Sequence, residues 1–341
     1  MKKTILLLAF CFAFLECSSQ KTFTKEDYEK ALSKYMKTIT PSELKEHLYI
    51  FASDEFEGRN TGEPGQKKAA KYIQDFYAKE GIQSPESPYV QNYLQPIPAK
   101  TFPRIAKDTE NVLGFIKGSE KPDEILIISA HYDHVGVRNG EIFNGADDDG
   151  SGSVALLEIA QAFQKAVKDG FSPKRSILFL HVTAEEIGLL GSKFYTDIQP
   201  VFPLENTIAN LNIDMIGRVD EKHQNEPNYV YLIGSDKLST ELHNLSESVN
   251  QKYTQLKLDY TYNDDNDPNR FYYRSDHYNF AKNNIPIIFY FNGVHPDYHQ
   301  PTDTPDKINY EILAKRTQLV FATAWELANA ENRPVVDKAQ K

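Results

Sequence analysis

Acidic residues gather in one short stretch of the chain, Phe143 to Gly152, which reads FNGADDDGSG. Asp147, Asp148 and Asp149 are consecutive, and like charges this close repel one another unless a cation or a donor offsets them. A solvated acidic turn that caps the following helix is the plainer interpretation. The alternative is that one of the three carboxylates is held against a metal ion, and the rest of the chain decides between the two.

More acids and histidines follow apolar runs that have the composition of buried strands. Each one alone is more often structural than functional. However, an acid or a histidine recurs at the end of every central apolar run, and open parallel sheets carry their sites at the carboxyl ends of the strands. The residues at these positions are His131, Asp133, Glu185, Glu186, Asp214, His295 and His299. Together with the acid triplet they predict a metal centre.

The cysteine content narrows the choice of metal. Cys11 and Cys17 are the only cysteines, and both lie in or beside an N-terminal leader, so the ligands must be His, Asp or Glu. Two histidines with three or four carboxylates suit one or two Zn²⁺ ions. A carboxylate that bridges two metals about 3.5–4 Å apart is the usual core of a two-metal hydrolase site. A bridging acid would also explain the triplet.

Helices and strands alternate along most of the chain. Periodicity predicts helices over Thr24–Thr38, Pro41–Phe51 and Asn309–Glu331, and strands over Tyr89–Ile97 and Asn111–Lys117. Near-continuous apolar runs between helices indicate a mostly parallel sheet covered on both faces. We see no internal repeat and no linker, so we expect one domain. The polar, aromatic stretch from 261 to 277 is expected to be a long loop.

Five motifs make the chain recognisable: SAHYDH, NGADDDGSG, TAEEIGLLGS, NIDMIGR and YHQPTDTPD. In their order and spacing the chain resembles the zinc-dependent exopeptidases typified by bacterial leucyl aminopeptidase and aminopeptidase Y, which are related to glutaminyl cyclase. The resemblance runs from about Ser53 to the end of the last helix. It implies an α/β fold, a three-layer α/β/α domain with a mixed, mostly parallel sheet of about eight strands.

The resemblance also implies a di-zinc metallopeptidase and assigns its ligands. Asp148 would bridge the two Zn²⁺ ions. His131 and Asp214 would complete one site, and Glu186 and His299 would complete the other. The peptide bond that follows Asp148 would be cis. The implied activity is removal of N-terminal residues from peptide substrates by a hydroxide that bridges the metals.

Further roles come from the same resemblance. Glu185 would be the general base that takes a proton from the water between the ions. Asp133 would orient the imidazole of His131. A tyrosine before the Ser-Asp-His stretch would stabilise the oxyanion, and spacing favours Tyr272 over Tyr273. His134, His181 and His277 are interpreted as structural, and whether His295 lines the pocket is left open.

Three rival functions are weighed. Glutaminyl cyclase, with one zinc, usually has a tryptophan near the final histidine, whereas Trp325 lies in the last helix and Tyr298 precedes His299. A binding ectodomain that has lost its metals is disfavoured because all five ligands are present. A carboxypeptidase of the same fold needs a cation for the substrate carboxylate, and Arg218 or Arg274 could supply it.

The composition and the N-terminal segment limit the expected partners and the expected cellular location. The chain has 341 residues, 40% of them hydrophobic, and a net charge of −10, which argues against nucleic acid as a partner. A basic start and the apolar run Ile5–Leu15 predict a signal peptide over residues 1–20, ahead of a catalytic domain over 21–341 that begins with a helical segment. We expect export to the periplasm, cell surface or medium, with a lipid anchor at Cys17 as the alternative to a free mature protein. No other apolar segment reaches the roughly 18 residues of a membrane span.

Overall fold

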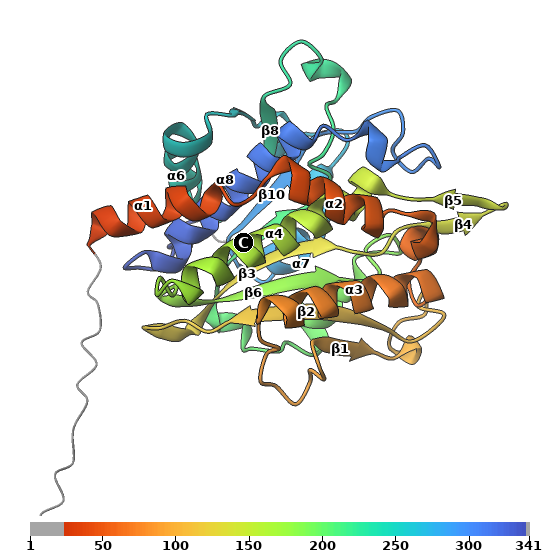
Figure 1. Cartoon of the computed structure of the whole chain (residues 1–341), viewed down its shortest axis with the longest axis horizontal. Coiled ribbons are helices and arrows are strands. Elements are labelled where there is room, and N and C mark those ends of the chain that lie inside the picture. The colour runs from red at the N-terminus through yellow and green to blue at the C-terminus, as the bar shows by residue number, and fades with distance from the viewer. Residues whose placement is uncertain (1–23, 339–341) are drawn as a thin grey trace, which may run out of the picture.

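A mixed sheet of eight strands runs through the computed structural model, which describes residues 24–338 (Figure 1). The strand order is β1-β2-β6-β3-β7-β10-β8-β9, and the central strands β6, β3, β7 and β10 are parallel. The strands of the sheet are β1 (Leu94–Ile97), β2 (Thr109–Ile116), β3 (Lys121–His131), β6 (Arg175–Val182), β7 (Thr207–Ile213), β8 (Tyr229–Ile233), β9 (Lys257–Asp259) and β10 (Ile287–Phe291). Strands β4 (Gly136–Arg138) and β5 (Glu141–Phe143) form a separate hairpin that projects from the body.

Helices cover both faces of the sheet. One face carries α1 (Lys25–Met36), α2 (Pro41–Phe51), α3 (Pro64–Glu80), α4 (Gly152–Lys168), α6 (Thr240–Val249) and α8 (Tyr310–Asn329). The other face carries the shorter helices α5 (Leu190–Lys193) and α7 (His277–Ala281) together with aromatic loop residues. The prediction of a three-layer α/β/α domain with a mixed, mostly parallel sheet is therefore confirmed.

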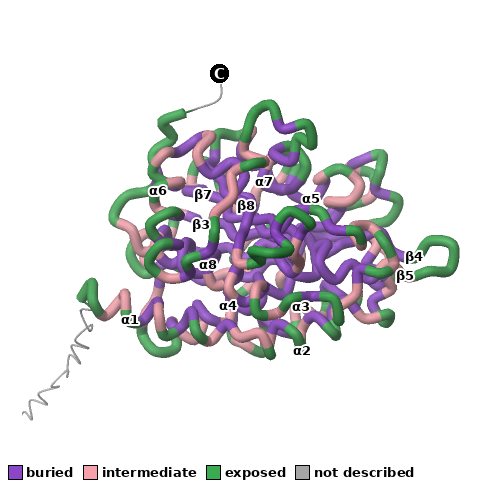
Figure 2. The backbone as a smooth tube through the Cα atoms, turned by 90° about the horizontal axis from the view of Figure 1, so that it is seen from above, coloured by how far each residue is buried: buried purple, intermediate pink, exposed green. Residues whose placement is uncertain are grey.

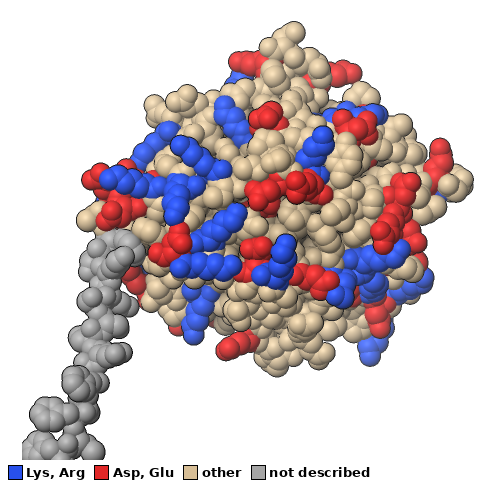
Figure 3. All heavy atoms as spheres, in the orientation of Figure 1, with Lys and Arg blue, Asp and Glu red and all other residues tan. Residues whose placement is uncertain are grey.

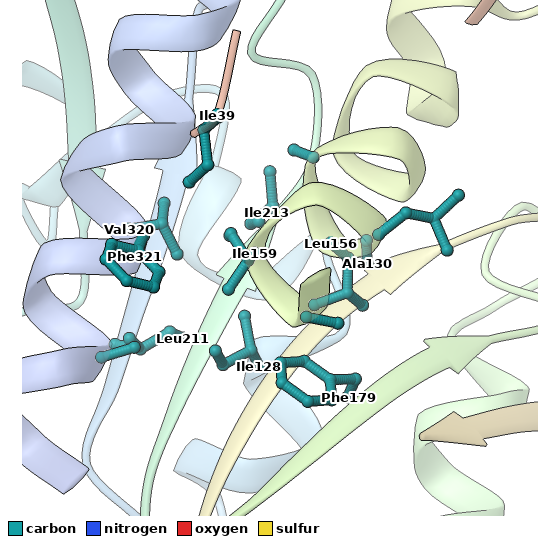
Figure 4. Packing of buried hydrophobic residues seen from close by; sticks show 14 of the residues in the cluster. Ile39, Ile128, Ala130, Leu156, Ile159, Phe179, Leu211, Ile213, Val320 and Phe321 are labelled. Carbon is teal, nitrogen blue, oxygen red and sulfur yellow. The ribbon is translucent and has the colours of Figure 1, made fainter. Parts of the chain in front are cut away.

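Strand β3 shows why the central strands read as unbroken apolar runs. Successive side chains of a strand point to opposite faces. Ile128 and Ala130 pack into the core beneath α4, against Leu156 and Ile159 (Figure 4), whereas Ile127 packs into the core of the opposite face. Because both faces are covered, the buried positions are nearly all apolar, and the buried polar Ser129 donates a hydrogen bond to Asn212 Oδ1. The strand ends at the first residue that turns toward the site.

Some element boundaries differ from the predicted ones. The strand expected over Tyr89–Ile97 begins only at Leu94, because Asn92 and Tyr93 have positive φ angles of 49° and 71° and form a turn. The strand expected over Asn111–Lys117 runs instead from Thr109 to Ile116. The predicted loop over 261–277 is a loop with two short helical turns. The predicted signal peptide and Cys17 lie outside the described residues.

Exposure is concentrated in turns and on the outer faces of the helices, while the sheet is buried (Figure 2). On the helical face shown in Figure 3, basic and acidic side chains lie next to one another, as in the ion pairs Lys30–Glu26 and Lys71–Asp75. Within residues 24–338, no helix combines the length and the apolar character that crossing a bilayer requires.

Candidate metal centre

The carboxyl ends of the central parallel strands bring the predicted site residues together. His131 is the last residue of β3, and Asp214 follows directly after β7. Glu185 and Glu186 come shortly after β6, and His299 lies in the loop that follows β10. Because β6, β3, β7 and β10 are neighbours in the sheet, their carboxyl ends form one edge. The side chains that follow them meet there.

Asp148 stands between two groups of potential ligands. Its Oδ1 atom lies 3.2 Å from His131 Nε2, and its Oδ2 atom lies 2.9 Å from His299 Nε2. On the first side, His131 Nε2 is 3.6 Å from Asp214 Oδ1. On the second side, His299 Nε2 is 3.1 Å from Glu186 Oε2. The two groups therefore share one carboxylate, with one oxygen turned toward each.

Two further residues belong to these groups. Ligand atoms of Glu185, His131 and Asp214 all lie within 4.8 Å of one another, as do those of His134, Asp148 and Glu186. The Nδ1 atom of the buried His134 is 2.7 Å from Glu186 Oε1. The sequence predicts a structural role for His134, although the HYDH motif places it three residues after His131. We call the seven residues (His131, His134, Asp148, Glu185, Glu186, Asp214 and His299) the candidate metal centre.

The donor set fits zinc. His131 Nε2, Asp148 Oδ2 and Glu186 Oε1 are buried and make no hydrogen bond with any described residue. Buried polar atoms without a partner are rare in native proteins and require an explanation. Imidazole nitrogens and carboxylate oxygens are the donors that Zn²⁺ takes in the absence of thiolates. A cation between these atoms would satisfy them.

The electrostatics of the centre also call for positive charge. Burial raises the pKa of Glu185 well above its ordinary value, against the opposing charge of His131 and together with the nearby Asp214 carboxylate. Burial acts the same way on the pKa of Asp148, but the close contacts with the imidazoles of His131 and His299 outweigh it and hold that pKa well below the ordinary value. The same contacts raise the pKa of His299 to about 10, although burial opposes this. The carboxylates thus draw protons onto the histidines where a metal ion could stand.

Asp133 connects Thr61, the backbone of Glu185 and the imidazole of His131. It is fully buried, and its Oδ2 atom accepts a hydrogen bond from the Thr61 hydroxyl at 2.9 Å. Its Oδ1 atom accepts the backbone N–H of Glu185 at 3.2 Å. His131 Nδ1 lies 3.1 Å from the Asp133 carbonyl oxygen and 3.8 Å from its carboxylate. The residue therefore lies beside the imidazole that it is predicted to orient, with its backbone oxygen closer than its carboxylate.

The acid triplet is buried, which excludes the solvated turn: the exposed fractions of Asp147, Asp148 and Asp149 are 0%, 3% and 0%. Asp149 holds backbone rather than facing the ligands. Its Oδ1 atom accepts the N–H groups of Gly152 at 2.9 Å and Met215 at 3.0 Å, and its Oδ2 accepts that of a strand-end residue, His131, at 3.2 Å. The peptide bond between Asp148 and Asp149 is cis, as the resemblance implies.

A small cavity opens beside the centre. Its walls are mostly apolar and aromatic, and its floor carries the acids of the centre. The lining residues are Asp148, Glu185, Asp214, Met215, Phe271, Arg274, Phe289, Phe291, Val294, Tyr298 and His299. Tyr298 stacks on His299 with ring centroids 4.0 Å apart, and its hydroxyl accepts a hydrogen bond of 3.4 Å from Arg274 Nη2.

The tyrosines expected to serve an oxyanion, Tyr272 and Tyr273, do not line this cavity. Tyr272 is buried among aromatic residues, including His277 and Tyr278, and is not one of the residues that line the cavity. Tyr273 is 44% exposed and packs under Arg270. The role given to Tyr272 stays a prediction. The sequence reasoning missed Tyr298 as a site residue, although its place directly before His299 was a usable signal.

Two other histidines lie in the core. His181 is in β6, and its Nε2 atom lies 2.9 Å from the hydroxyl of Tyr77. His277 begins α7, and its Nε2 atom lies 2.8 Å from the carbonyl oxygen of Tyr272. Burial lowers the pKa of each to about 3. Both are therefore held neutral, as structural histidines are.

Known proteins are similar to this chain in sequence. Peptidase family M28 matches residues 111–324. Aminopeptidase YwaD of Bacillus subtilis is 29% identical over 239 residues, covering 68% of this chain and 48% of its own length. The chain thus spans about half of that relative.

Solved structures share the fold at lower sequence identity. The LapA aminopeptidase of Legionella pneumophila superposes with a TM-score of 0.70 at 21% identity, covering 92% of this chain and 79% of its own. Glutaminyl cyclase of Bacteroides thetaiotaomicron superposes with a TM-score of 0.61 at 16% identity, covering 86% and 99%. The family match takes in the four central strands and every residue of the candidate metal centre. The resemblance read from the five motifs is confirmed, and the chain belongs to peptidase family M28.

Proposed function

We propose that this chain is a di-zinc aminopeptidase that releases N-terminal residues from peptides. The observation that carries the proposal is the position of Asp148, whose two carboxylate oxygens face two different groups of ligand atoms. A single tetrahedral zinc needs at most four ligands. The candidate metal centre offers more donors than one ion can use, and it divides them about a shared carboxylate.

The residues would hold the ions as follows. His131 and Asp214 would bind the first zinc, Glu186 and His299 would bind the second, and Asp148 would bind both. Zinc bound there supplies Lewis acidity, which polarises a peptide carbonyl and makes water more acidic. His134 contacts Glu186 and fixes the orientation of that carboxylate.

Glu185 moves the proton. Its carboxylate lies in the first group without serving as a ligand in this proposal, and its backbone N–H is fixed by Asp133. It takes a proton from the water that attacks the peptide carbonyl and delivers it to the departing amine nitrogen. Transfer of this kind typically accounts for about 10²- to 10⁴-fold in rate.

Tyr298 stabilises the charge that develops on the carbonyl oxygen. Its hydroxyl oxygen accepts from Arg274, so its own proton is free to donate into the cavity. The apolar wall made by Phe271, Phe289 and Phe291 excludes water and receives the side chain of the N-terminal residue. We further propose that the chain is exported under the signal peptide at residues 1–20.

One observation favours a carboxypeptidase as the second candidate. Arg218 is occupied, because its Nη2 atom lies 2.8 Å from Asp297. Arg274 lines the cavity, and no carboxylate within residues 24–338 lies within ion-pair distance of it. It could therefore meet a substrate carboxylate. Glutaminyl cyclase receives no such support, because Trp325 packs against Tyr35 and Phe163 in the helical layer, away from the cavity.

The test combines metal content with substrate blocking. Purified protein should contain two equivalents of zinc, lose activity to a chelator, and regain it with Zn²⁺. It should cleave amino-acid p-nitroanilides that have a free amine and leave N-acetylated ones intact. Cleavage of peptides with a blocked N-terminus and a free C-terminus would establish the carboxypeptidase instead. Full activity with one zinc would contradict the two-metal centre.

A further inference from the structure

Asp147, the first acid of the triplet, joins three segments that are distant in the sequence. Its fully buried carboxylate accepts the backbone N–H of Gly217 at 2.6 Å through Oδ1. Its Oδ2 atom lies 3.1 Å from His295 Nε2. Gly217 belongs to the segment after β7, and His295 belongs to the loop after β10, which also carries His299. Asp147 therefore ties the acid triplet to that loop.

Asp303 makes a second connection from the far end of the same loop. It is fully buried, and its Oδ2 atom accepts the backbone N–H groups of Asp147 at 2.9 Å and Asp148 at 3.2 Å. Its carbonyl oxygen accepts the N–H of Ala146 at 3.1 Å. Asp303 lies four residues beyond His299 and holds the backbone that presents the shared carboxylate. Neither Asp147 nor Asp303 is one of the seven residues of the candidate metal centre.

The positive charge of Arg218 lies between two acids of this loop, Asp297 and Asp303. Its Nη2 atom is 2.8 Å from Asp297 Oδ2, and its Nη1 atom is 3.8 Å from Asp303 Oδ1. Its side chain is only 14% exposed, and its backbone N–H donates to Asn292 Oδ1 at 2.7 Å. A buried ion pair that loses one partner leaves an uncompensated charge, which is costly. We call Asp147, Arg218, His295, Asp297 and Asp303 the interloop clamp.

The two ligand groups differ in what holds them. His131 and Asp214 stand at the ends of β3 and β7, which pair directly through Ala130 and Ile213. His299, by contrast, lies in a loop, has a positive φ of 55°, and its side chain is 37% exposed. Strand pairing fixes His131 and Asp214 without help from the clamp, and Asp149 ties the backbone beside the shared carboxylate to the same strand ends through the N–H groups of His131 and Met215. The second group has no such frame within its own segment.

We propose that the interloop clamp presets the second zinc group by holding the loop that carries His299 against the backbone of Asp148. Arg218 and Asp303 are then positioning residues. This inference rests on the proposed function. Partners of this kind behind a metal ligand typically change metal affinity by about 10- to 100-fold. Loss of the clamp should weaken the zinc held by Glu186 and His299, and leave the zinc held by His131 and Asp214 close to its original affinity.

Zinc release from the intact holoprotein under graded chelator tests the clamp. Asp303→Ala should release one equivalent of zinc at a chelator concentration about 10- to 100-fold lower than the wild type requires, and keep the other. Its stoichiometry should match that of His299→Gln and differ from that of His131→Gln. Asp303→Asn, which keeps an oxygen for the two N–H groups, should recover part of the affinity. The chelator concentration that releases zinc from Arg218→Gln should lie between those for the wild type and Asp303→Ala. If Asp303→Ala fails to fold, Arg218→Gln replaces it in the test.

Glu158→Gln is the matched control. Glu158 is a buried carboxylate on α4, paired with His47 at 3.3 Å, and it touches neither ligand group. Its loss should lower thermal stability without changing zinc release. If Asp303→Ala and Arg218→Gln release zinc as the control does, or release both ions together, the clamp inference is overturned while the proposed function stands. A wild-type protein that holds no zinc overturns both.

Discussion

Two clusters that bury histidine beside carboxylate can be compared within residues 24–338, because their charges are matched differently. The first is the candidate metal centre. The second, which we call the His223 cluster, consists of Asp220, Lys222, His223, Tyr231 and Asp259 near β8 and β9. Both bury acids beside imidazoles. Only one lies at the carboxyl ends of the central parallel strands.

In the His223 cluster every carboxylate oxygen has a donor. Asp220 Oδ1 accepts from His223 Nδ1 at 2.8 Å, and its Oδ2 accepts from the Tyr231 hydroxyl at 2.7 Å. Asp259 accepts from Lys222 Nζ at 2.8 Å and from the backbone N–H of Thr261 at 2.8 Å. The carboxylates of this cluster are therefore satisfied without any ligand, and the buried atom that makes no hydrogen bond, His223 Nε2, lies 3.3 Å from Asp259 Oδ2. It fastens the edge strand β9 to the turn after β7.

The candidate metal centre has the opposite balance. Its carboxylates outnumber its histidines, and unlike those of the His223 cluster they include buried oxygens, Asp148 Oδ2 and Glu186 Oε1, that make no hydrogen bond with any described residue. A buried polar network that is only partly satisfied is costly. Burial and histidine content therefore do not separate a functional cluster from a structural one. The number of hydrogen-bond donors available to the buried carboxylates does separate them. This comparison can be tested by substituting single residues.

Asp148→Asn should have the largest effect. An amide cannot supply the charge that both ions share, so zinc content should fall and activity should drop further than the about 10²- to 10⁴-fold that loss of proton transfer alone costs. Zinc analysis and kcat/KM measure both. Equal zinc binding by Asp147→Asn, Asp148→Asn and Asp149→Asn would contradict the central role of Asp148.

Glu185→Gln and Glu186→Gln should separate catalysis from metal binding. In Glu185→Gln the new amide keeps the volume of the native side chain but cannot take up a proton. We therefore expect kcat to fall about 10²- to 10⁴-fold, roughly 3–5 kcal/mol on the barrier, with two zincs retained. Glu186→Gln should lose one zinc as well as activity. The comparison requires kcat and zinc stoichiometry for both variants, and zinc loss by Glu185→Gln with retention by Glu186→Gln would reverse the assignment.

The parts predicted from sequence were those set by local pattern. Apolar runs marked β3, β6 and β7, and the polar residues directly after each run, such as Asp214, fell at one edge because parallel strands place them there. The partners of Arg218 and the reach of Asp303 could not be predicted. They depend on how a loop folds back, across a separation of 155 residues, to the backbone of Asp148, and no local periodicity encodes that path. Tyr298, by contrast, stands directly before a predicted ligand, His299, so its sequence position was a usable signal.

Asp149→Asn should have an intermediate effect that falls on stability. Asp149 uses both carboxylate oxygens to accept N–H groups of Gly152, Met215 and His131. The amide nitrogen of asparagine cannot accept, so at least one buried N–H group loses its partner, at a cost of about 1–3 kcal/mol. Denaturant unfolding should show this loss while two zincs remain bound at saturating Zn²⁺. Loss of zinc with unchanged stability would place Asp149 among the ligands.

Asp220→Asn should have the smallest effect on activity and so marks the other end of the comparison. The substitution leaves an amide nitrogen where His223 or the hydroxyl of Tyr231 now donates, and one buried donor loses its acceptor. Unfolding free energy should fall by about 1–3 kcal/mol. Zinc content and kcat/KM should equal those of the wild type, because no atom of the His223 cluster is a ligand. The variant is therefore compared with Asp148→Asn, which replaces the same side chain with the same amide. If Asp220→Asn lost zinc or activity while it remained folded, a complete set of donors would no longer distinguish a structural cluster from a functional one.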